Sequence, residues 1–141
     1  MVRPISIGLI GTGVHGARYA RHLMKDVPGL SLAANSRRSS LGEQQAREWG
    51  VRWFRRWQDL IEDSVVEAVI AVATPNLNPA IAAACARARK PLLVEKPLAV
   101  DVSSASEMVD AFASAGISLT VGQTLRYNPI ILSLQKELHR I

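Results

Sequence analysis

The stretch from residue 5 to residue 16 constrains the fold more than any other part of the chain. It begins with an apolar, β-branched run over residues 5–10, which is typical of a buried parallel strand. Gly11, Gly13 and Gly16 follow at the spacing G-x-G-x-x-G. Residues 17–25 then suit a helix, and the pattern places Ala17, Ala20, Leu23 and Met24 on one face. The sequence therefore predicts a strand, a glycine-rich turn and a helix in direct succession.

Each glycine of this turn has a physical role in such a unit. Gly11 permits the sharp turn, Gly13 lets the backbone approach a pyrophosphate, and Gly16 allows the helix to pack closely on the strand. The amino end of the helix offers free N–H groups and a partial positive charge, which suit a diphosphate. Three glycines in a loop are also compatible with a simple turn, so their place between strand and helix matters. The loop residues predicted to contact a dinucleotide are Gly11, Thr12, Gly13, Val14, His15 and Gly16.

The rest of the chain alternates strands with helices. Further strands are expected at residues 30–35, 51–53, 67–73, 92–95 and 117–122. Helices are expected at residues 41–49, 57–62, 79 to about 89, from 103 or 104 to 115, and from 129 onward. Asn78 and Asn128 each precede a proline and are predicted to cap the helices that follow. This order predicts an α/β fold, a doubly wound and mostly parallel sheet with helices on both faces (Rossmann), whose ligands sit at the carboxyl ends of the strands.

Composition narrows the function classes. A chain of 141 residues corresponds to one domain, here a dinucleotide-binding domain over residues 1–141. The net charge is +5, but the basic residues are scattered and no nucleic-acid recognition motif accompanies them, so we expect no nucleic-acid partner. The single cysteine, Cys85, excludes an internal disulfide, is expected to be a buried inert thiol, and fits a reducing, cytoplasmic setting. No apolar run reaches the roughly 20 residues that span a bilayer, and the four residues before the first strand leave no room for a signal peptide.

The loop after the second strand bears on the choice of cofactor. Enzymes that use NAD place an acidic residue about 20 positions beyond the glycines, to hold the ribose 2′-hydroxyl. Here the loop contains Ser36, Arg37 and Arg38 and no carboxylate. A serine and two guanidinium groups suit a 2′-phosphate, and Arg37 could also stack on the adenine. The pattern favours NADP over NAD, and a merely solvated basic loop is the alternative.

Two further motifs end the fourth and fifth strands. Thr74, Pro75 and Asn76 follow the fourth strand, and Glu95 and Lys96 follow the fifth, on either side of where a nicotinamide would lie. Lys96 is the catalytic candidate, because a cation at this edge can hydrogen-bond a substrate hydroxyl and stabilise negative charge as its proton leaves. The alternative is a solvent-facing lysine paired with Glu95.

These motifs, together with residues 125–129 (Leu-Arg-Tyr-Asn-Pro), resemble the N-terminal half of the Gfo/Idh/MocA oxidoreductases, in the family's order and spacing. The resemblance implies an NAD- or NADP-dependent oxidoreductase that acts on a sugar, an inositol or a related polyol. It also implies a cis bond between Lys96 and Pro97. The residues that it assigns to the cofactor are the glycine loop, Ser36, Arg37, Thr74, Pro75, Asn76, Glu95, Lys96 and Arg126, with Asn128 near the entry to a second domain.

The chain departs from the family pattern in three ways. Pro79 stands where the family often has histidine, and residues 89–91 (Arg-Lys-Pro) stand where it often has a glycine before the fifth strand. The family's C-terminal substrate domain, which usually supplies a catalytic histidine, is absent from the 141 residues. His15, His22 and His139 are expected to offer no base beside Lys96, and no metal site is apparent.

Three functional hypotheses follow. The first is the cofactor-binding domain of an oxidoreductase that prefers NADP, incomplete for turnover by itself and with an apolar surface near residues 97–98, 127 and 129–131 that would favour a homo-oligomer. The second is a non-catalytic module that binds or senses a nucleotide. The third is a binder of a different nucleotide such as coenzyme A. The presence of Lys96, which a pure nucleotide binder does not need, favours the enzyme.

Overall fold

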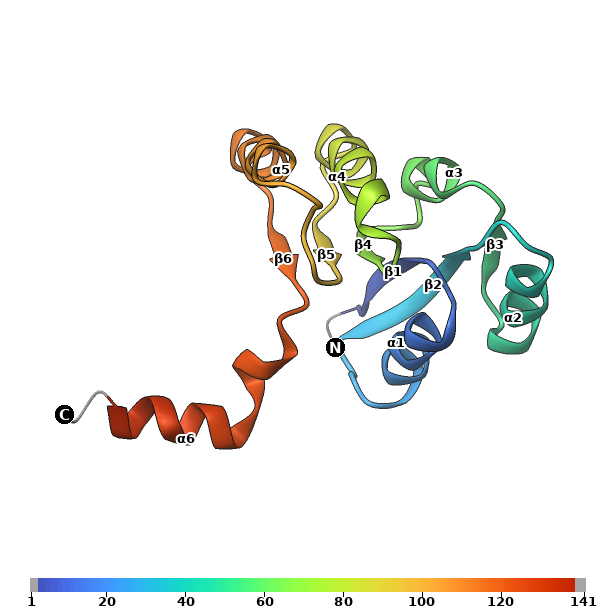
Figure 1. Cartoon of the computed structure of the whole chain (residues 1–141). Helices are drawn as coiled ribbons and strands as arrows, with labels where there is room; N and C mark the ends of the chain where they lie inside the picture. Colours follow the sequence, from blue (N-terminus) through green and yellow to red (C-terminus); the bar gives the residue numbers. More distant parts are fainter. Residues whose placement is uncertain (1–2, 139–141) are drawn as a thin grey trace.

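The computed structural model describes residues 3–138 and contains one six-stranded sheet (Figure 1). The strand order is β3-β2-β1-β4-β5-β6, and every neighbouring pair is parallel. The strands are β1 (Ile5–Ile10), β2 (Leu30–Ser36), β3 (Arg52–Phe54), β4 (Ala68–Ala71), β5 (Leu92–Val94) and β6 (Leu119–Val121). The helices are α1 (Val14–Lys25), α2 (Leu41–Trp49), α3 (Trp57–Glu62), α4 (Asn78–Arg87), α5 (Val102–Ala115) and α6 (Pro129–Leu138), with short 3-10 turns η1 (Pro75–Leu77) and η2 (Thr124–Tyr127).

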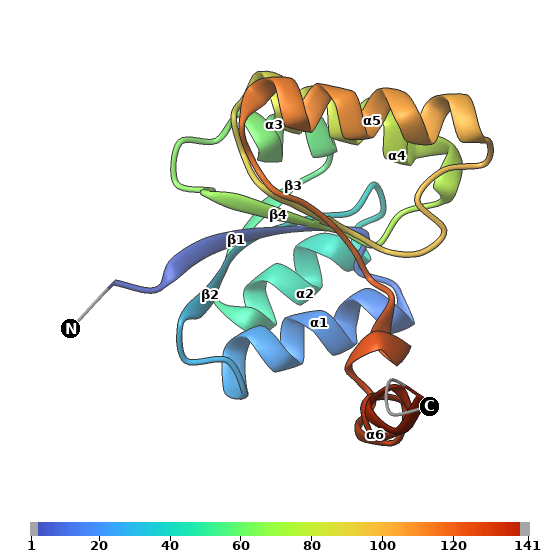
Figure 2. The ribbon, with the colours of Figure 1, turned by 90° about the vertical axis from the view of Figure 1, so that its left-hand side faces the viewer.

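Helices cover both faces of this sheet. Figures 1 and 2 show α3, α4 and α5 in one layer and α1 and α2 in the other, with the sheet between them. The predicted doubly wound parallel fold is confirmed. The strands β4 and β6 are shorter than expected, with β4 paired to β1 over Ala68–Ala71 and β6 paired to β5 over Leu119–Val121.

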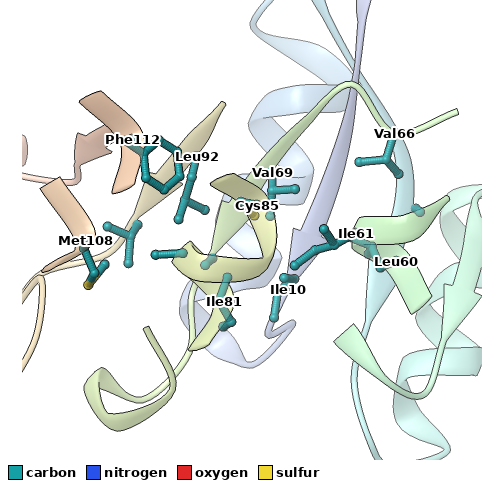
Figure 3. Close-up of a cluster of buried hydrophobic side chains, with 14 residues drawn as sticks. Ile10, Leu60, Ile61, Val66, Val69, Ile81, Cys85, Leu92, Met108 and Phe112 are labelled. Atoms are coloured by element: carbon teal, nitrogen blue, oxygen red, sulfur yellow. The ribbon is translucent and has the colours of Figure 1, made fainter. Parts of the chain in front are cut away.

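The main hydrophobic core lies between the sheet and the layer of α3, α4 and α5. Figure 3 shows Ile81 and Cys85 of α4 at its centre, between Ile10 of β1 and Phe112 of α5. Cys85 is fully buried, and this burial raises the pKa of its thiol to about 12. The expectation of an inert buried thiol is therefore confirmed.

The buried face of α1 differs slightly from the predicted one. Gly16, Ala20 and Leu23 are buried, whereas Met24 is 41% exposed. At 100° per residue, Met24 lies one position further around the helix than Leu23 and so misses the sheet. The second core cluster, beneath α1, is completed by Ile7, Leu9, Leu32 and Ile70.

Two of the predicted helix starts need correction. Asn78 does not cap α4 but is its first residue, because η1 leads directly into the helix. Helix α5 begins at Val102 rather than at residue 103 or 104, and its cap is Asp101, whose carboxylate accepts a hydrogen bond of 2.8 Å from the backbone N–H of Ser104. The predicted role of Asn128 is confirmed, since its Oδ1 accepts from the N–H of Ile130 at 2.9 Å.

The end of α4 also comes earlier than expected. The helix stops at Arg87, and Arg89 has a φ of +55°, in the left-handed region. This segment, residues 89–91, has Arg-Lys-Pro where the family that the chain resembles often has a glycine. The backbone at Arg89 has a conformation that glycine adopts without cost and arginine does not.

Helix α6 extends away from the sheet (Figure 1) and has no buried residue among those described. Ile130 is 76% exposed, and Tyr127 just before the helix is 71% exposed. The predicted apolar surface is present at these two residues, whereas Leu98 and Ile131 are half-buried. Within residues 3–138, no helix is both long enough and apolar enough to cross a membrane.

Candidate functional site

The loops that carry the predicted site residues meet at one edge of the sheet. The N–H of Gly11 donates to the carbonyl of Ser36 at 2.9 Å, and the N–H of Arg37 donates to the carbonyl of Phe54 at 3.2 Å. On the other side, the N–H of Glu95 donates to the carbonyl of Ala71 at 3.0 Å. These bonds connect the carboxyl ends of neighbouring strands, where ligands of this fold bind.

The glycine loop has the geometry that its sequence predicts. Gly11 has a φ of +84°, and a Cβ added there would lie 2.1 Å from the carbonyl oxygen of Val72. A Cβ on Gly16 would lie 1.9 Å from the carbonyl oxygen of Gly11, so only glycine lets α1 approach the loop this closely. Gly13, the first residue before α1, faces open space, with no atom within 4 Å of its added Cβ. The first turn of α1 contains no acidic residue, which leaves the amino end open to an anion.

The side chain of Thr12 is buried rather than open to a ligand. Its Oγ1 donates to Oε1 of Gln45 in α2 at 2.6 Å, and it is 1% exposed. The carbonyl of Thr12 accepts from Nε2 of Gln45 at 3.0 Å and from Nη1 of Arg37 at 2.8 Å. Thr12 therefore braces the glycine loop against α2 and the β2 loop. Val14, by contrast, is 84% exposed.

A hollow of about 240 Å³ lies beside this loop, at the ends of β1, β2 and β4. Its polar rim comes from Ser36, Arg37, Arg38 and Thr74 together with Arg55, a residue that the sequence analysis did not select. Its apolar lining comes from Ile10, Trp57, Val72, Ala73 and Leu77. An apolar slot with a polar, cationic rim has the chemistry of a site for an adenosine group.

The remaining residues after β4 lie outside this hollow. Pro75 and Asn76 belong to η1, and Asn76 is exposed. Arg126 lies on η2, in a different hollow of about 570 Å³ that it shares with Pro97, Leu98 and Tyr127. The structure thus brings together the residues of β1, β2 and β4 and separates Arg126 from them.

Glu95 is the centre of a small hydrogen-bonded cluster. Its Oε1 accepts from the hydroxyl of Tyr19 at 2.6 Å and lies 2.9 Å from Nε2 of His15, and its Oε2 accepts from the N–H of Lys96 at 3.1 Å. Burial opposes ionisation of Glu95, but the hydrogen bonds from Tyr19 and His15 outweigh it, and the pKa of Glu95 lies below its ordinary value. Burial, followed by the bond to Glu95, raises the pKa of Tyr19. Tyr19 was not selected from the sequence, although its position four residues after His15 places both on one face of α1.

Lys96 projects from the end of β5 as an exposed side chain. The alternative in which it simply pairs with Glu95 is not what the structure shows, because Glu95 is bonded to His15 and Tyr19 instead. The Lys96–Pro97 bond is cis, as the resemblance implies. Buried Asn78 supports this segment, since its Nδ2 donates to the carbonyls of Pro97 at 3.2 Å and Leu98 at 3.0 Å.

The histidines only partly follow the expectation. His15 contacts the residue next to Lys96, which is closer than predicted, because the amino end of α1 faces the end of β5. His22 pairs with Asp26 on the exposed side of α1, and His139 lies outside the described residues. Within residues 3–138, no group of three or more His, Cys, Asp or Glu side chains could hold a metal ion.

The chain is similar in sequence to a known protein family and to several curated proteins. Residues 5–123 match the family GFO_IDH_MocA, described as an oxidoreductase family with an NAD-binding Rossmann fold. The chain is 33% identical over 137 residues to inositol 2-dehydrogenase 2 of Saccharopolyspora erythraea, which covers 95% of this chain and 40% of that protein. It is 34% identical to the inositol 2-dehydrogenase of Rubrobacter xylanophilus, over 89% of this chain and 37% of that protein.

The solved structures agree. The myo-inositol 2-dehydrogenase of Lactobacillus plantarum superposes with a TM-score of 0.91 and 26% identity, over 98% of this chain and 42% of that chain. The present chain therefore spans about 40% of the length of the curated relatives it matches. Its fold, its glycine loop and the matched 119 residues (5 through 123) lead to one conclusion: the chain belongs to the Gfo/Idh/MocA oxidoreductase family, as its NAD-binding Rossmann fold.

Proposed function

We propose that this chain is the cofactor-binding domain of an NAD(P)-dependent oxidoreductase that acts on an inositol or a related polyol. The observation that carries the proposal is the meeting of three features at one sheet edge: the open amino end of α1, the apolar hollow beside Ser36, and Lys96. The relatives named inositol 2-dehydrogenase support the substrate class.

The residues present fit a dinucleotide. Open space around Gly13 admits a diphosphate against the first N–H groups of α1, whose first turn contains no acidic residue. Ser36 lines the hollow and would meet the adenosine ribose, and Thr74 also lines it. When bound, the nicotinamide supplies hydride transfer, while the protein supplies binding, orientation and charge.

Lys96 is proposed to act on the substrate oxygen. An exposed ammonium group that Glu95 does not neutralise can hydrogen-bond a hydroxyl and stabilise negative charge as the proton leaves. The anchored carboxylate of Glu95 fixes the backbone N–H of Lys96 and so holds the start of this segment in place.

We further propose that a second domain completes the site. The hollow of about 570 Å³ between Pro97 and Tyr127, and the uncovered apolar side of α6, form the surface to which such a domain would attach. That domain would shape the polyol pocket and supply the base. Self-association through the same surface and a cytoplasmic location with no nucleic-acid partner remain parts of this proposal.

The test is a titration of the purified chain with NADH, NADPH and coenzyme A, followed by incubation with NAD or NADP and myo-inositol. The expected result is that a dinucleotide binds and that the nicotinamide absorbance shows no steady turnover, because orientation of both reactants is worth about 7–11 kcal/mol of barrier. Binding of coenzyme A alone would favour the non-catalytic alternative. Steady turnover would show that no second domain is needed.

A further inference from the structure

Two adjacent strands are each followed directly by a pair of arginines. β2 ends at Ser36 and is followed by Arg37 and Arg38, and β3 ends at Phe54 and is followed by Arg55 and Arg56. In the parallel register Ser36 lies opposite Phe54, and the N–H of Arg37 donates to the carbonyl of Phe54 at 3.2 Å. The two arginine pairs therefore start side by side at the edge that carries the proposed adenosine hollow.

Two of these four guanidinium groups are already engaged. Arg37 donates from Nη1 to the carbonyl of Thr12 at 2.8 Å and from Nε to Oγ of Ser39 at 3.0 Å. Arg56 lies 3.9 Å from a carboxylate oxygen of Asp59. Arg38 and Arg55 are exposed, and neither forms an ion pair or side-chain hydrogen bond within the described part of the chain.

Arg38 and Arg55 line both the adenosine hollow and a second hollow of about 280 Å³ next to it. Trp57 and Leu77 are also common to the two hollows, so they are neighbouring parts of one depression. No aspartate or glutamate lines either one. Like charges gathered without a carboxylate repel one another and attract anions, and guanidinium groups form short charge-assisted bonds with phosphate oxygens.

We propose that Arg38 and Arg55 together form a clamp for a phosphomonoester on the 2′-oxygen of the bound adenosine, which rests on the proposed dinucleotide function. A phosphomonoester carries about −1.5 to −2 charges at pH 7, enough to engage two cations. In this arrangement Arg37 is a positioning residue that braces the glycine loop, and the phosphate is held by one arginine from each of two loops. This differs from the sequence-based expectation, in which Ser36, Arg37 and Arg38 of a single loop hold the phosphate.

The probes are fragments that differ only in the position of one phosphate: 5′-ADP, 2′,5′-ADP and 3′,5′-ADP, each titrated into the purified chain by calorimetry. We expect 2′,5′-ADP to bind at least about tenfold more tightly than 5′-ADP, and more tightly than 3′,5′-ADP. Arg38→Gln and Arg55→Gln should each reduce this preference about tenfold or remove it, where the preference is the ratio of 2′,5′-ADP to 5′-ADP affinity measured within each variant. Arg56→Gln is the matched control, since its partner is Asp59, and should keep the preference.

The outcomes separate this inference from the proposed function. If NADH and 5′-ADP bind but 2′,5′-ADP has no advantage, the clamp is wrong and the dinucleotide function stands. Failure of every dinucleotide and fragment to bind removes both. A preference for 3′,5′-ADP, or one that Arg55→Gln leaves intact, also overturns the clamp; melting curves of the variants verify that these exposed substitutions leave the fold unchanged.

Discussion

Substitution of Gly16 by alanine tests the link between close packing and cofactor binding. The added Cβ would lie 1.9 Å from the carbonyl oxygen of Gly11, and real contacts of this kind are essentially never below 3.0 Å, so the two atoms must separate by at least 1.1 Å (3.0 minus 1.9). The opposing atom is backbone of the glycine loop, which cannot rotate aside as a side chain can. Gly16→Ala should therefore displace the loop that we propose to receive the diphosphate.

The magnitude follows from two opposing terms. Overpacking costs about 1–3 kcal/mol, whereas replacing a helical glycine by alanine returns up to about 1 kcal/mol of helix propensity. With the full 1 kcal/mol returned, the net loss is about 0–2 kcal/mol, and at about 2–4 °C per kcal/mol for a domain near 150 residues the fall in Tm reaches up to about 8 °C. NADH binding should be lost in the same variant, measured by titration beside the thermal melt.

Gly13→Ala and Gly29→Ala are the matched controls, because nothing lies within 4 Å of either added Cβ. Gly13→Ala should melt within about 1 kcal/mol of the natural chain yet lose affinity for NADH, since its methyl group enters the space proposed for the diphosphate. Gly29→Ala, in the turn before β2, should change neither. If Gly16→Ala keeps both its Tm and its affinity, or if Gly13→Ala binds NADH normally, the reasoning about this loop is refuted.

Three further predictions concern other parts of the chain. Arg89→Gly should increase the free energy of unfolding by about 0.5–1 kcal/mol, because it removes a left-handed arginine at φ +55°; an unchanged denaturant midpoint would contradict this. Tyr19→Phe should raise the pKa of Glu95, followed by NMR of its carboxyl carbon. In the folded protein the pKa of Glu95 lies below its ordinary value of 4.5, so ionised Glu95 adds stability above that pH, and this contribution is lost as the pH falls through the folded pKa. The Tyr19→Phe variant should therefore lose less stability than the natural chain between neutral pH and pH 3. Equal acid-denaturation profiles would count against the contact. Phe112→Ala should cost about 3–5 kcal/mol in chemical denaturation because the ring is 2% exposed in the main core, and a cost below 1 kcal/mol would place the core elsewhere.

The sequence was sufficient for the order of elements and for the sheet edge that holds the site. Periodicity and turn residues are local signals, and they located every strand and helix of the described chain within a few residues. Contacts between side chains distant in sequence were not accessible in this way. The bond from Tyr19 to Glu95 joins residues 76 positions apart, and that from Thr12 to Gln45 joins residues 33 positions apart.

Asn78 shows how a local signal can mislead. Asparagine before proline is a strong capping pattern, yet here the amide is used for a contact 19 and 20 residues away, because the preceding η1 turn already begins the helical path. Arg55 was missed for a related reason. Arg55 reaches the hollow only because β3 lies next to β2, and β3 is too short for this pairing to be predicted from the sequence alone.

The two hydrogen bonds of Asn78 also have a consequence for how this site can change during evolution. Both hydrogens of the amide are used, one on the carbonyl of Pro97 and one on that of Leu98, and Asn78 is joined directly to the turn that contains Pro75 and Asn76. The segment that follows β4 is thereby hydrogen-bonded to the segment that follows β5, so that the two can move only together. A lineage that moves the segment after β4 or the segment after β5 must move the other with it or lose these hydrogen bonds, so we expect substitutions in the two segments to arise in pairs.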